Sequence, residues 1–297
     1  MRRASPVIAF SVAVLGIFTF SCLDAVMKVL VLSLGTFTAL FWRNLAGIAV
    51  SGAIYAAKRQ PLPSRPALKL HIIRGSVSTI MSIAFFWGLA RVPLAQTVAM
   101  TFIAPLLSLF LSARLLNERI TVKTILASVI AFVGVLVILW GQWHAALGHA
   151  AFLGTLAILF SAVCYAYNIV LMRQQALVSG PIEVAFWQSV VIAVLIGIGA
   201  PFFASLPSLI QAPMILLAAL LAVSSLLLLA WAYARGEASY LSTSEYTAFI
   251  WASAFGWLLF GERVSLATVA GTLLIVGGCI VAARRGAVAL IDTQAAP

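Results

Sequence analysis

Apolar runs of about 20 residues alternate with short polar breaks along the whole length of this chain. A helix rises about 1.5 Å per residue, so a run of that length crosses the ~30 Å hydrocarbon core of a bilayer. Of the 297 residues, 64% are hydrophobic and 8% are charged, whereas a soluble domain carries roughly 25% charged residues. The sequence also lacks the alternating segments of about 10 residues that are typical of a transmembrane β-barrel. It therefore predicts an all-α polytopic membrane protein.

The apolar runs predict ten transmembrane helices. Their expected bounds are Val7–Val29, Thr36–Ala57, Leu68–Leu89, Leu94–Ala113, Val122–Trp140, Phe152–Met172, Ile182–Ala204, Met214–Ala234, Ser239–Phe260 and Leu266–Ala283. The first run is too long for a cleaved signal peptide, so it counts as a span. The polar breaks are too short to hold a soluble domain.

The net charge of +11 is explained by membrane topology and does not indicate a nucleic-acid partner. With the N-terminus inside, the inner side receives fourteen of the 18 basic residues: Arg2, Arg3, Lys58, Arg59, Arg65, Lys69, Arg74, Arg114, Arg119, Lys123, Arg173, Arg235, Arg284 and Arg285. The outer side receives four: Lys28, Arg43, Arg91 and Arg263. Cytoplasmic loops of membrane proteins carry an excess of Lys and Arg. This bias predicts that both termini lie in the cytoplasm.

The segment between Arg91 and Leu139 has a second, similar copy later in the chain. An offset of 144 residues carries Arg91 to Arg235 and Glu118 to Glu262 without a gap. The same offset carries Arg119 to Arg263, Thr124 to Thr268 and Gly134 to Gly278. The matches fall at turns and helix ends, which favours an internal duplication.

The duplication predicts two repeats of five spans, over residues 1–145 and 146–297. Five is an odd number, so the second repeat enters the membrane from the opposite side. Arg91 then lies outside and its counterpart Arg235 inside. Inverted repeats of this kind recur in secondary transporters, where they alternate access around a site near the midplane. A duplication that only built a stable helical bundle is the alternative.

Several segments resemble the drug/metabolite transporter superfamily, and specifically its EamA family. The segments are Ala104–Arg119, Glu245–Trp251, Gly256–Arg263, the pair Trp42-Arg43, and the run Cys164-Tyr165-Ala166-Tyr167-Asn168. The resemblance covers nearly the whole chain and both repeats. One position departs from the family pattern, since Phe249 stands in the second repeat where Pro105 stands in the first. The two halves are therefore expected to bend differently.

The family resemblance implies a ten-helix carrier of small metabolites, often directed outward. Within the family, the chain most resembles bacterial exporters of aromatic amino acids. The resemblance also implies that spans one to four and six to nine enclose a central, largely apolar cavity, with spans five and ten at the periphery. The partners expected are therefore a small molecule and membrane lipid. Small residues on spans five and ten (Ala127, Ala131, Gly271 and Gly277) could pack helices within a monomer or between the subunits of a homodimer.

Polar and aromatic residues within the spans are the candidates for substrate binding and gating. Charges at the bilayer centre cost roughly 2.5–3.5 kcal/mol, so those that are retained need a reason. The outer set consists of Asp24, Lys28, Trp42, Arg43, Trp87, Gln96 and Thr101. The inner set consists of Tyr165, Asn168, Trp187, Gln188, Trp231 and Glu245, with Tyr246 beside it. Any single aromatic residue in such a set is also explained by packing.

Two groups of charged residues have structural explanations as well. Asp24 and Lys28 are four residues apart on one helix face and can pair. Arg43 can compete for Asp24. The three then form either an interfacial ion cluster or an outer gate. The two Glu-Arg turns at Glu118-Arg119 and Glu262-Arg263 are expected to cap helices at the interfaces.

Glu245 is the carboxylate placed well inside the second repeat. It either pairs with Arg173 or Arg235, or handles the amino group of a cargo or a coupling proton. A carboxyl group in an apolar cavity favours its neutral form unless a cation stays beside it. The second role therefore predicts no lasting cationic partner.

Enzymatic, ATP-driven and metal-dependent functions are not expected. The sequence contains no Walker A, H-E-x-x-H or G-x-S-x-G motif. The three cysteines and three histidines have neither metal-ligand nor disulfide spacing. No cofactor is therefore expected. A receptor or scaffold would not require an inverted repeat. The function predicted is an exporter of aromatic and other neutral amino acids, or of related metabolites, with broad drug efflux as the alternative.

Overall fold

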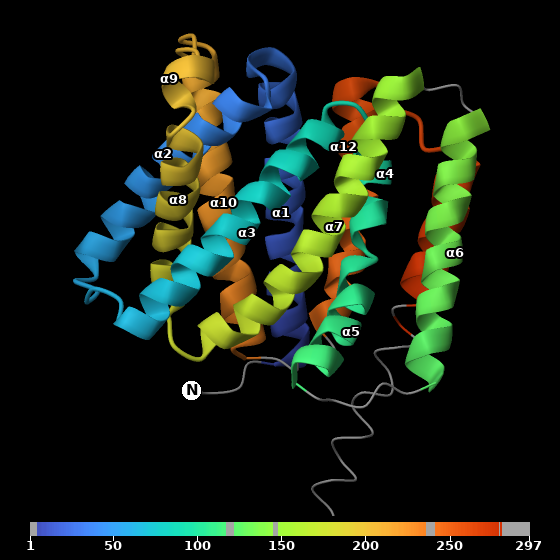
Figure 1. Ribbon diagram of the computed structural model, residues 1–297, viewed down its shortest axis with the longest axis horizontal. Helices are drawn as coiled ribbons and strands as arrows, with labels where there is room; N and C mark the ends of the chain where they lie inside the picture. Colours follow the sequence, from blue (N-terminus) through green and yellow to red (C-terminus); the bar gives the residue numbers. More distant parts are fainter. Residues whose placement is uncertain (1–4, 117–121, 145–147, 236–240, 279, 281–297) are drawn as a thin grey trace, which may run out of the picture.

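The protein is described by a computed structural model, which covers residues 5–116, 122–144, 148–235, 241–278 and 280. All regular secondary structure in these residues is helical, and none of them forms a strand. Figure 1 shows the helices running between two ends of a bundle, which we call the lower end and the upper end as drawn. The helices are α1 Pro6–Leu34, α2 Thr36–Ala57, α3 Arg65–Leu89, α4 Leu94–Thr101, α5 Ala104–Leu116, α6 Val122–His144, α7 Gly148–Ala176, α8 Pro181–Gly197, α9 Ala200–Phe203, α10 Gln211–Tyr233, the 3₁₀ turn η1 Ser242–Tyr246, α12 Thr247–Phe260 and a last helix, Leu266–Gly278.

Each expected span overlaps one of these helices or a broken pair of them within the described residues, and parts of the ninth and tenth spans lie outside those residues. Five helices among the described residues (α1, α2, α3, α7 and α10) are long and apolar enough to cross a membrane by length and composition. Three of the expected spans are interrupted. The fourth is divided into α4 and α5, the seventh into α8 and α9, and the ninth into η1 and α12.

The interruptions of the fourth and ninth spans occupy equivalent positions. The first falls at Phe102 and Ile103, just before Pro105, which lacks the N–H that would continue the helix. The second falls at the change from 3₁₀ to α geometry after Tyr246, although Phe249 replaces the proline there. The two halves therefore bend at the same place but by different local means.

The outside of the bundle exposes many large apolar side chains. Ile250 is 61% exposed, Leu273 68% and Phe202 82%. Contiguous exposed apolar surface is rare on soluble monomers and marks a membrane or protein contact. The buried core lies between helices of both halves, where Met27, Leu40 and further large side chains are fully enclosed. The chain is a multi-pass membrane protein.

Helix packing follows the offset of 144 residues seen in the sequence. Helix α3 packs against α7 and α8, and the helix 144 residues later, α10, packs against α1 and α2. In the same way α5 packs against α7, and α12 packs against α1. The core is thus built from contacts between the two halves.

Spans that occupy equivalent positions also pack directly on one another. Helix α2 of the second span contacts α8 of the seventh, and α4 of the fourth span contacts α12 of the ninth; in the second pair Leu94 lies at Glu262 while Phe102 lies at Tyr246. The third pair is α6 and the last helix, at one edge of the bundle in Figure 1. In the last two pairs, residue numbers rise along one partner while those of the contacting residues fall along the other. Both pairs are therefore antiparallel.

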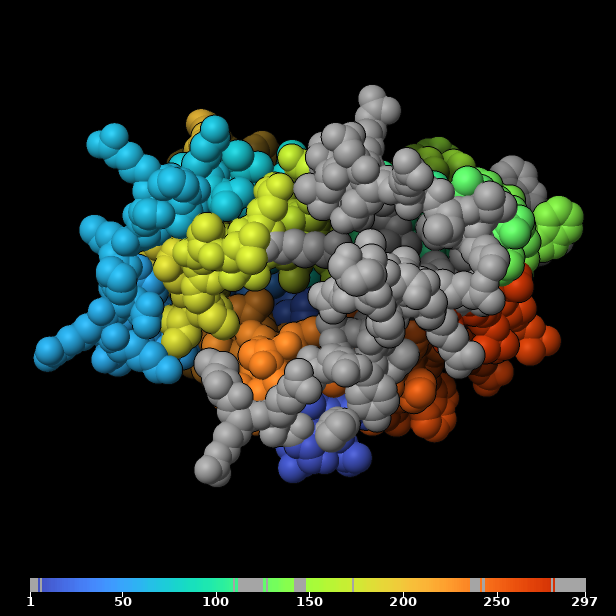
Figure 2. Space-filling view, turned by 90° about the horizontal axis from the view of Figure 1, so that it is seen from below, coloured from blue at the N-terminus to red at the C-terminus, as the bar shows by residue number. Residues whose placement is uncertain are grey.

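The lower end gathers the turns that join α2 to α3 and α7 to α8. Figure 2 shows these segments, in cyan and yellow, side by side on the lower face. Lys58 and Arg59 in the turn before α3, and Arg65 at the start of α3, are exposed. At the upper end Gly35 lies between α1 and α2 with a φ of 78°, a left-handed conformation that glycine adopts without strain.

Candidate functional site

The end of α12 positions the carboxylate of Glu262 at the upper end. Gly261 has a φ of 64°, and its N–H bonds the Trp257 carbonyl at 3.1 Å. The Glu262 N–H bonds the Gly256 carbonyl at 3.0 Å, and the helix ends in an αL cap at Gly261. A Cβ on Gly256 would lie 2.8 Å from Glu262 Oε2. The two glycines therefore turn the chain and leave space for the Glu262 side chain to fold back.

The Glu262 carboxylate joins three segments, and we call this set the upper bridge. One oxygen, Oε1, lies 2.5 Å from Nζ of Lys28 on α1. The other, Oε2, accepts the N–H of Leu94 at 2.7 Å and so caps the start of α4. Lys28 also donates to the Val92 carbonyl at 2.8 Å. The expected capping role of Glu262 is correct, but the helix that it caps belongs to the other half of the chain.

The expected pairing of Asp24 with Lys28 is wrong, because Lys28 turns to Glu262 instead. The electrostatic partner of Asp24 is Arg43, the competitor suggested by the sequence. Asp24 is 4% exposed, and its Oδ1 has no hydrogen-bond partner. Arg43 reaches the Asn44 side chain at 3.4 Å and lies over the ring of Phe86. Asp24 and Arg43 therefore interact electrostatically, but no salt bridge joins them within the described residues.

The other outer candidates are spread along the upper half of the bundle. The Trp42 indole donates to a carbonyl in the turn after α9, at 2.9 Å. Trp87 stacks under the guanidinium of Arg91, which lies 3.6 Å from the ring centre. Gln96 is buried beside Glu262, and Thr101 bonds a carbonyl of its own helix at the break after α4. These residues do not form one cluster.

A second set of polar side chains, the lower network, is the main finding that the sequence did not predict. Arg74 on α3 donates through Nε to Asn168 Oδ1 at 2.9 Å and through Nη1 to Gln175, both on α7. Gln175 bonds Nδ1 of His71 at 2.6 Å. His71 Nε2 lies 2.9 Å from the carboxylate of Glu183, in the first turn of α8. The network thus ties α3 of the first half to α7 and α8 of the second.

Two assignments change as a result. Arg74 was counted among the basic residues of the inner side, and neither Arg74 nor His71 was a candidate site residue. Arg74 is 6% exposed and His71 1%. The spacing of three between them, which places both on one helix face, was the available signal.

Glu245 lies in η1, and its carboxylate accepts the hydroxyl of Tyr233 at 3.1 Å. No Lys, Arg or His of the described chain lies within salt-bridge distance of it. The expected alternative pairing with Arg235 is wrong, because Arg235 stacks 4.4 Å over Trp231 and donates to the Trp231 carbonyl. The side chain of Arg173 is outside the described part of the structure. Tyr165 interacts electrostatically with both Glu245 and Arg74.

The remaining inner candidates surround this region. Asn168 is buried and held by Arg74, and Trp187 stacks on His71 with 6.1 Å between ring centres. Gln188 is half-buried in α8. Tyr246 packs against Phe102, with ring centres 5.6 Å apart. Arg91 on Trp87 and Arg235 on Trp231 repeat one local geometry at an interval of 144 residues.

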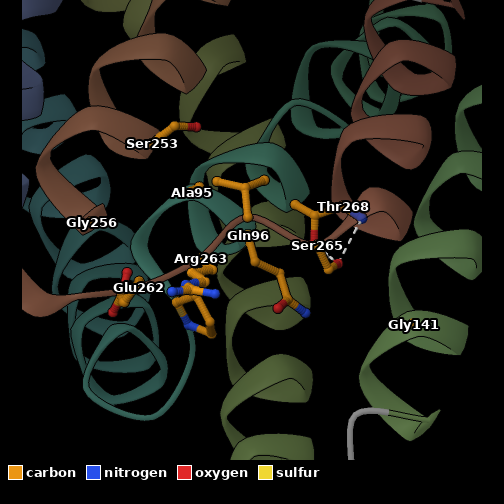
Figure 3. A pocket seen from close by; sticks show the side chains of 11 residues that line it. Ala95, Gln96, Gly141, Ser253, Gly256, Glu262, Arg263, Ser265 and Thr268 are labelled. Carbon is orange, nitrogen blue, oxygen red and sulfur yellow. Dashed lines mark hydrogen bonds between the residues drawn. The ribbon is translucent and has the colours of Figure 1, made fainter.

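A pocket opens at the upper end between α4, the end of α12, α6 and the start of the last helix (Figure 3). It has a volume of about 120 Å³. Its polar lining residues are Gln96, Ser253, Glu262, Arg263, Ser265 and Thr268. Within the described residues no three His, Cys, Asp or Glu side chains are placed to hold a metal ion.

The family assignment agrees with this arrangement. The model of the EamA-like transporter family matches residues 7–140 and again residues 152–284. The chain belongs to the EamA-like transporter family. Its relatives are transporters rather than enzymes. The two matches cover the two halves that the sequence repeat separates.

Several curated relatives are similar over most of this chain. The pseudopaline exporter CntI of Pseudomonas aeruginosa is 27% identical over 92% of this chain and 94% of its own length. The S-adenosylmethionine uptake transporter of Rickettsia bellii is 22% identical over 88% of both. The riboflavin transporter of Rhizobium johnstonii is 28% identical over 84% and 82%. A solved crystal structure, 22% identical, covers 95% of this chain and the whole of its own with a TM-score of 0.63, which supports the fold alone.

Proposed function

We propose that this member of the EamA-like transporter family exports small amphipathic metabolites across the bacterial inner membrane by alternating access. Aromatic and other neutral amino acids are the proposed cargo. The observation that carries this proposal is Glu245, a carboxylate inside the bundle with a tyrosine hydroxyl as its partner and no cation within salt-bridge distance among the described residues. Such a group can accept an ammonium or a proton and release it when water arrives.

Alternating access requires two arrangements of one scaffold, which an inverted repeat provides. The proposed repeats are residues 1–145 and 146–297, each with five spans. The antiparallel packing of equivalent helices and the matched contacts of α3 and α10 support this symmetry. The lower end is then cytoplasmic, in agreement with the exposed Lys58, Arg59 and Arg65 at this end. Both termini lie on that side.

The two polar sets are the proposed gates. The upper bridge joins Lys28 and Leu94 of the first repeat to Glu262 of the second. The lower network joins His71 and Arg74 of the first repeat to residues of the second. Each therefore crosses the boundary that must open at one end of the transport cycle.

The proposed cargo site lies between these gates, where Tyr165 interacts electrostatically with both Arg74 and Glu245. An α-amino acid presents a carboxylate and an ammonium, for which a guanidinium and a carboxylate are the complementary groups. Tyr165, Trp187 and Tyr246 supply aromatic surface for a side chain. The relatives support metabolite transport in general, and S-adenosylmethionine is itself an amino acid.

The alternative is a broad efflux carrier for cationic or aromatic drugs. The relatives are named for different cargoes, among them pseudopaline and riboflavin, and this variety supports the alternative. Uptake into proteoliposomes of radiolabelled amino acids, nucleosides and organic cations separates the two. Accumulation of phenylalanine and alanine without organic cations supports the proposal. The reverse pattern rejects it in favour of drug efflux.

The proposed topology has its own test. Single cysteines at Gln60 and Gln294 should be protected from a membrane-impermeant maleimide in intact cells, while a cysteine at Gly148 should react. Reaction at Gln294 from outside would reject both the topology and the inverted repeat.

A further inference from the structure

The pocket at the upper end is built from groups that attract an anion. Two helices begin at its wall: α4, represented by Ala95 and Gln96, and the last helix, whose start is capped by Ser265. The Ser265 hydroxyl accepts the Thr268 N–H at 3.1 Å. Helix N-termini carry partial positive charge and free N–H groups. A helix start alone does not make a binding site, so further evidence is needed.

Gln96 supplies that evidence. Its side chain is 5% exposed and lines the pocket, and its Nε2 has no hydrogen-bond partner. Figure 3 shows the side chain reaching between Arg263 on one side and Ser265 on the other. A buried amide donor without an acceptor costs about 1–3 kcal/mol. An occupant with an acceptor oxygen would recover that cost.

The charges around the pocket specify the sign of this occupant. Both oxygens of Glu262 are already engaged, one by Lys28 and the other by the Leu94 N–H. Arg263 is exposed at the pocket wall and has no acidic partner within salt-bridge distance in the described residues. Lys28 neutralises Glu262, so the positive charge of Arg263 is left in excess. The occupant favoured is therefore negatively charged.

The size of the pocket limits the occupant further. Its volume of about 120 Å³ is well below the roughly 300–1,000 Å³ of pockets for drug-sized ligands. A carboxylate on a short carbon skeleton fits this limit, and its two oxygens match the Gln96 amide and the Arg263 guanidinium.

We propose that this pocket is a second binding site, on the outer side, for the carboxylate of a small molecule. It is separate from the cargo site at Glu245 and does not depend on which cargo is carried. The Gln96 amide and the Arg263 guanidinium bind the carboxylate, and the start of the last helix adds its N–H groups. Glu262 forms part of the same wall, so an occupant lies against the residue that holds Lys28.

The test uses the full-length protein in lipid nanodiscs and measures thermal unfolding. The probes are acetate, which replaces chloride, methylammonium, which replaces sodium, and glycine. All are titrated at constant ionic strength. A ligand that binds only the folded state raises the Tm in a saturable way. We expect acetate and glycine to raise the Tm by a few degrees at saturation, and methylammonium to leave it unchanged. The relative affinities of acetate and glycine distinguish a simple acid from a zwitterion as the natural ligand.

The variants are Gln96→Leu, which removes the amide donor at similar size, and Arg263→Gln, an exposed substitution that removes the charge. Gln174→Leu on the exposed face of α7 is the matched control. Each pocket variant should weaken the apparent affinity for acetate about tenfold or more, since hydrogen bonds to charged groups contribute about 1.5–3 kcal/mol. Gln174→Leu should bind as the unaltered protein does.

Equal acetate shifts in all variants, or a shift with methylammonium and none with acetate, would overturn the proposal. Arg263→Gln keeps the test decisive if Gln96→Leu does not fold. Transport is not part of the measurement, so a negative result leaves the proposed carrier function unaffected. Conversely, loss of transport in Glu245→Gln has no bearing on binding here.

Discussion

Phe102 and Tyr246 are 144 residues apart in the chain and touch edge to face, with ring centres 5.6 Å apart and ring planes at 89°. Each lies at the break of its span: Phe102 directly follows α4, and Tyr246 is the last residue of η1. Two equivalent residues can meet only on the axis that relates their repeats. This contact therefore places the proposed pseudo-twofold axis between the two broken spans, next to Glu245.

We expect the Phe102–Tyr246 contact to couple the two halves energetically. Replacing either residue by Leu removes the edge-to-face geometry, which contributes about 0.5–1.5 kcal/mol beyond area burial. The double variant should therefore be more stable than the sum of the single losses predicts. Thermal unfolding of the four proteins in detergent measures this. Strict additivity would show that the rings touch without coupling the halves.

Breaking the upper bridge should destabilise the protein through loss of the partner charge. Lys28→Met leaves the Glu262 carboxylate with the Leu94 N–H as its remaining contact. Removal of one member of a buried ion pair costs about 3–5 kcal/mol, and less here because the Glu262 side chain is 18% exposed. The double variant Lys28→Met with Glu262→Gln should recover part of the loss. A double variant as unstable as the two losses combined would contradict the pairing.

Gly256→Ala provides an independent route to the same bridge. The added Cβ would lie 2.8 Å from Glu262 Oε2, so the carboxylate must move away from Leu94. We expect a loss of about 1–3 kcal/mol, the usual cost of overpacking a well-packed site. Gly277→Ala is the control, because nothing lies within 4 Å of its added Cβ. Equal Tm values for the two variants would contradict the assigned position of Glu262.

Arg74 should not tolerate replacement by lysine, although the charge is kept. Its planar fork binds Asn168 and Gln175 at once, which a lysine ammonium cannot do with the same geometry. Each lost bond to the charged group contributes about 1.5–3 kcal/mol. Arg74→Lys should therefore lower both the Tm and transport, whereas Lys69→Arg, in the first turns of the same helix, should change neither. Normal transport by Arg74→Lys would remove the lower network from the proposed mechanism.

The sequence predicted the helices well because hydropathy and turn residues act locally. The second span, Thr36–Ala57, agrees with α2 at both ends. The breaks after Thr101 and Gly197 were missed, because a continuous apolar run looks the same whether its helix is intact or interrupted. Pro105 signalled the first break, and the second half breaks at the equivalent place without a proline.

The pairing of charged side chains was much harder to predict. Spacing along one helix suggested Asp24 with Lys28, yet Lys28 pairs with Glu262, which lies 234 residues away in the chain. Such partners are set by how the halves dock, and no local pattern contains that information. Arg74 was not recognised as a site residue for a similar reason. Its position near a span end is equally compatible with a solvated and a buried side chain, and packing against α7 decides between them.

The last prediction concerns Glu245 and separates its two possible roles. Glu245→Gln keeps the size of the side chain and its ability to accept the Tyr233 hydroxyl, so the fold should be preserved. It removes the negative charge that an ammonium needs and the group that would carry a proton. Transport into proteoliposomes should therefore fall at least about tenfold, or lose its dependence on pH between about 5.5 and 8, a range that starts above the ordinary Glu titration. Tyr233→Phe is the matched control, because it removes the hydrogen bond but keeps the carboxylate. If Glu245→Gln transports normally over this range, Glu245 has a structural role. If Tyr233→Phe is impaired and Glu245→Gln is not, the hydrogen bond matters and the charge does not.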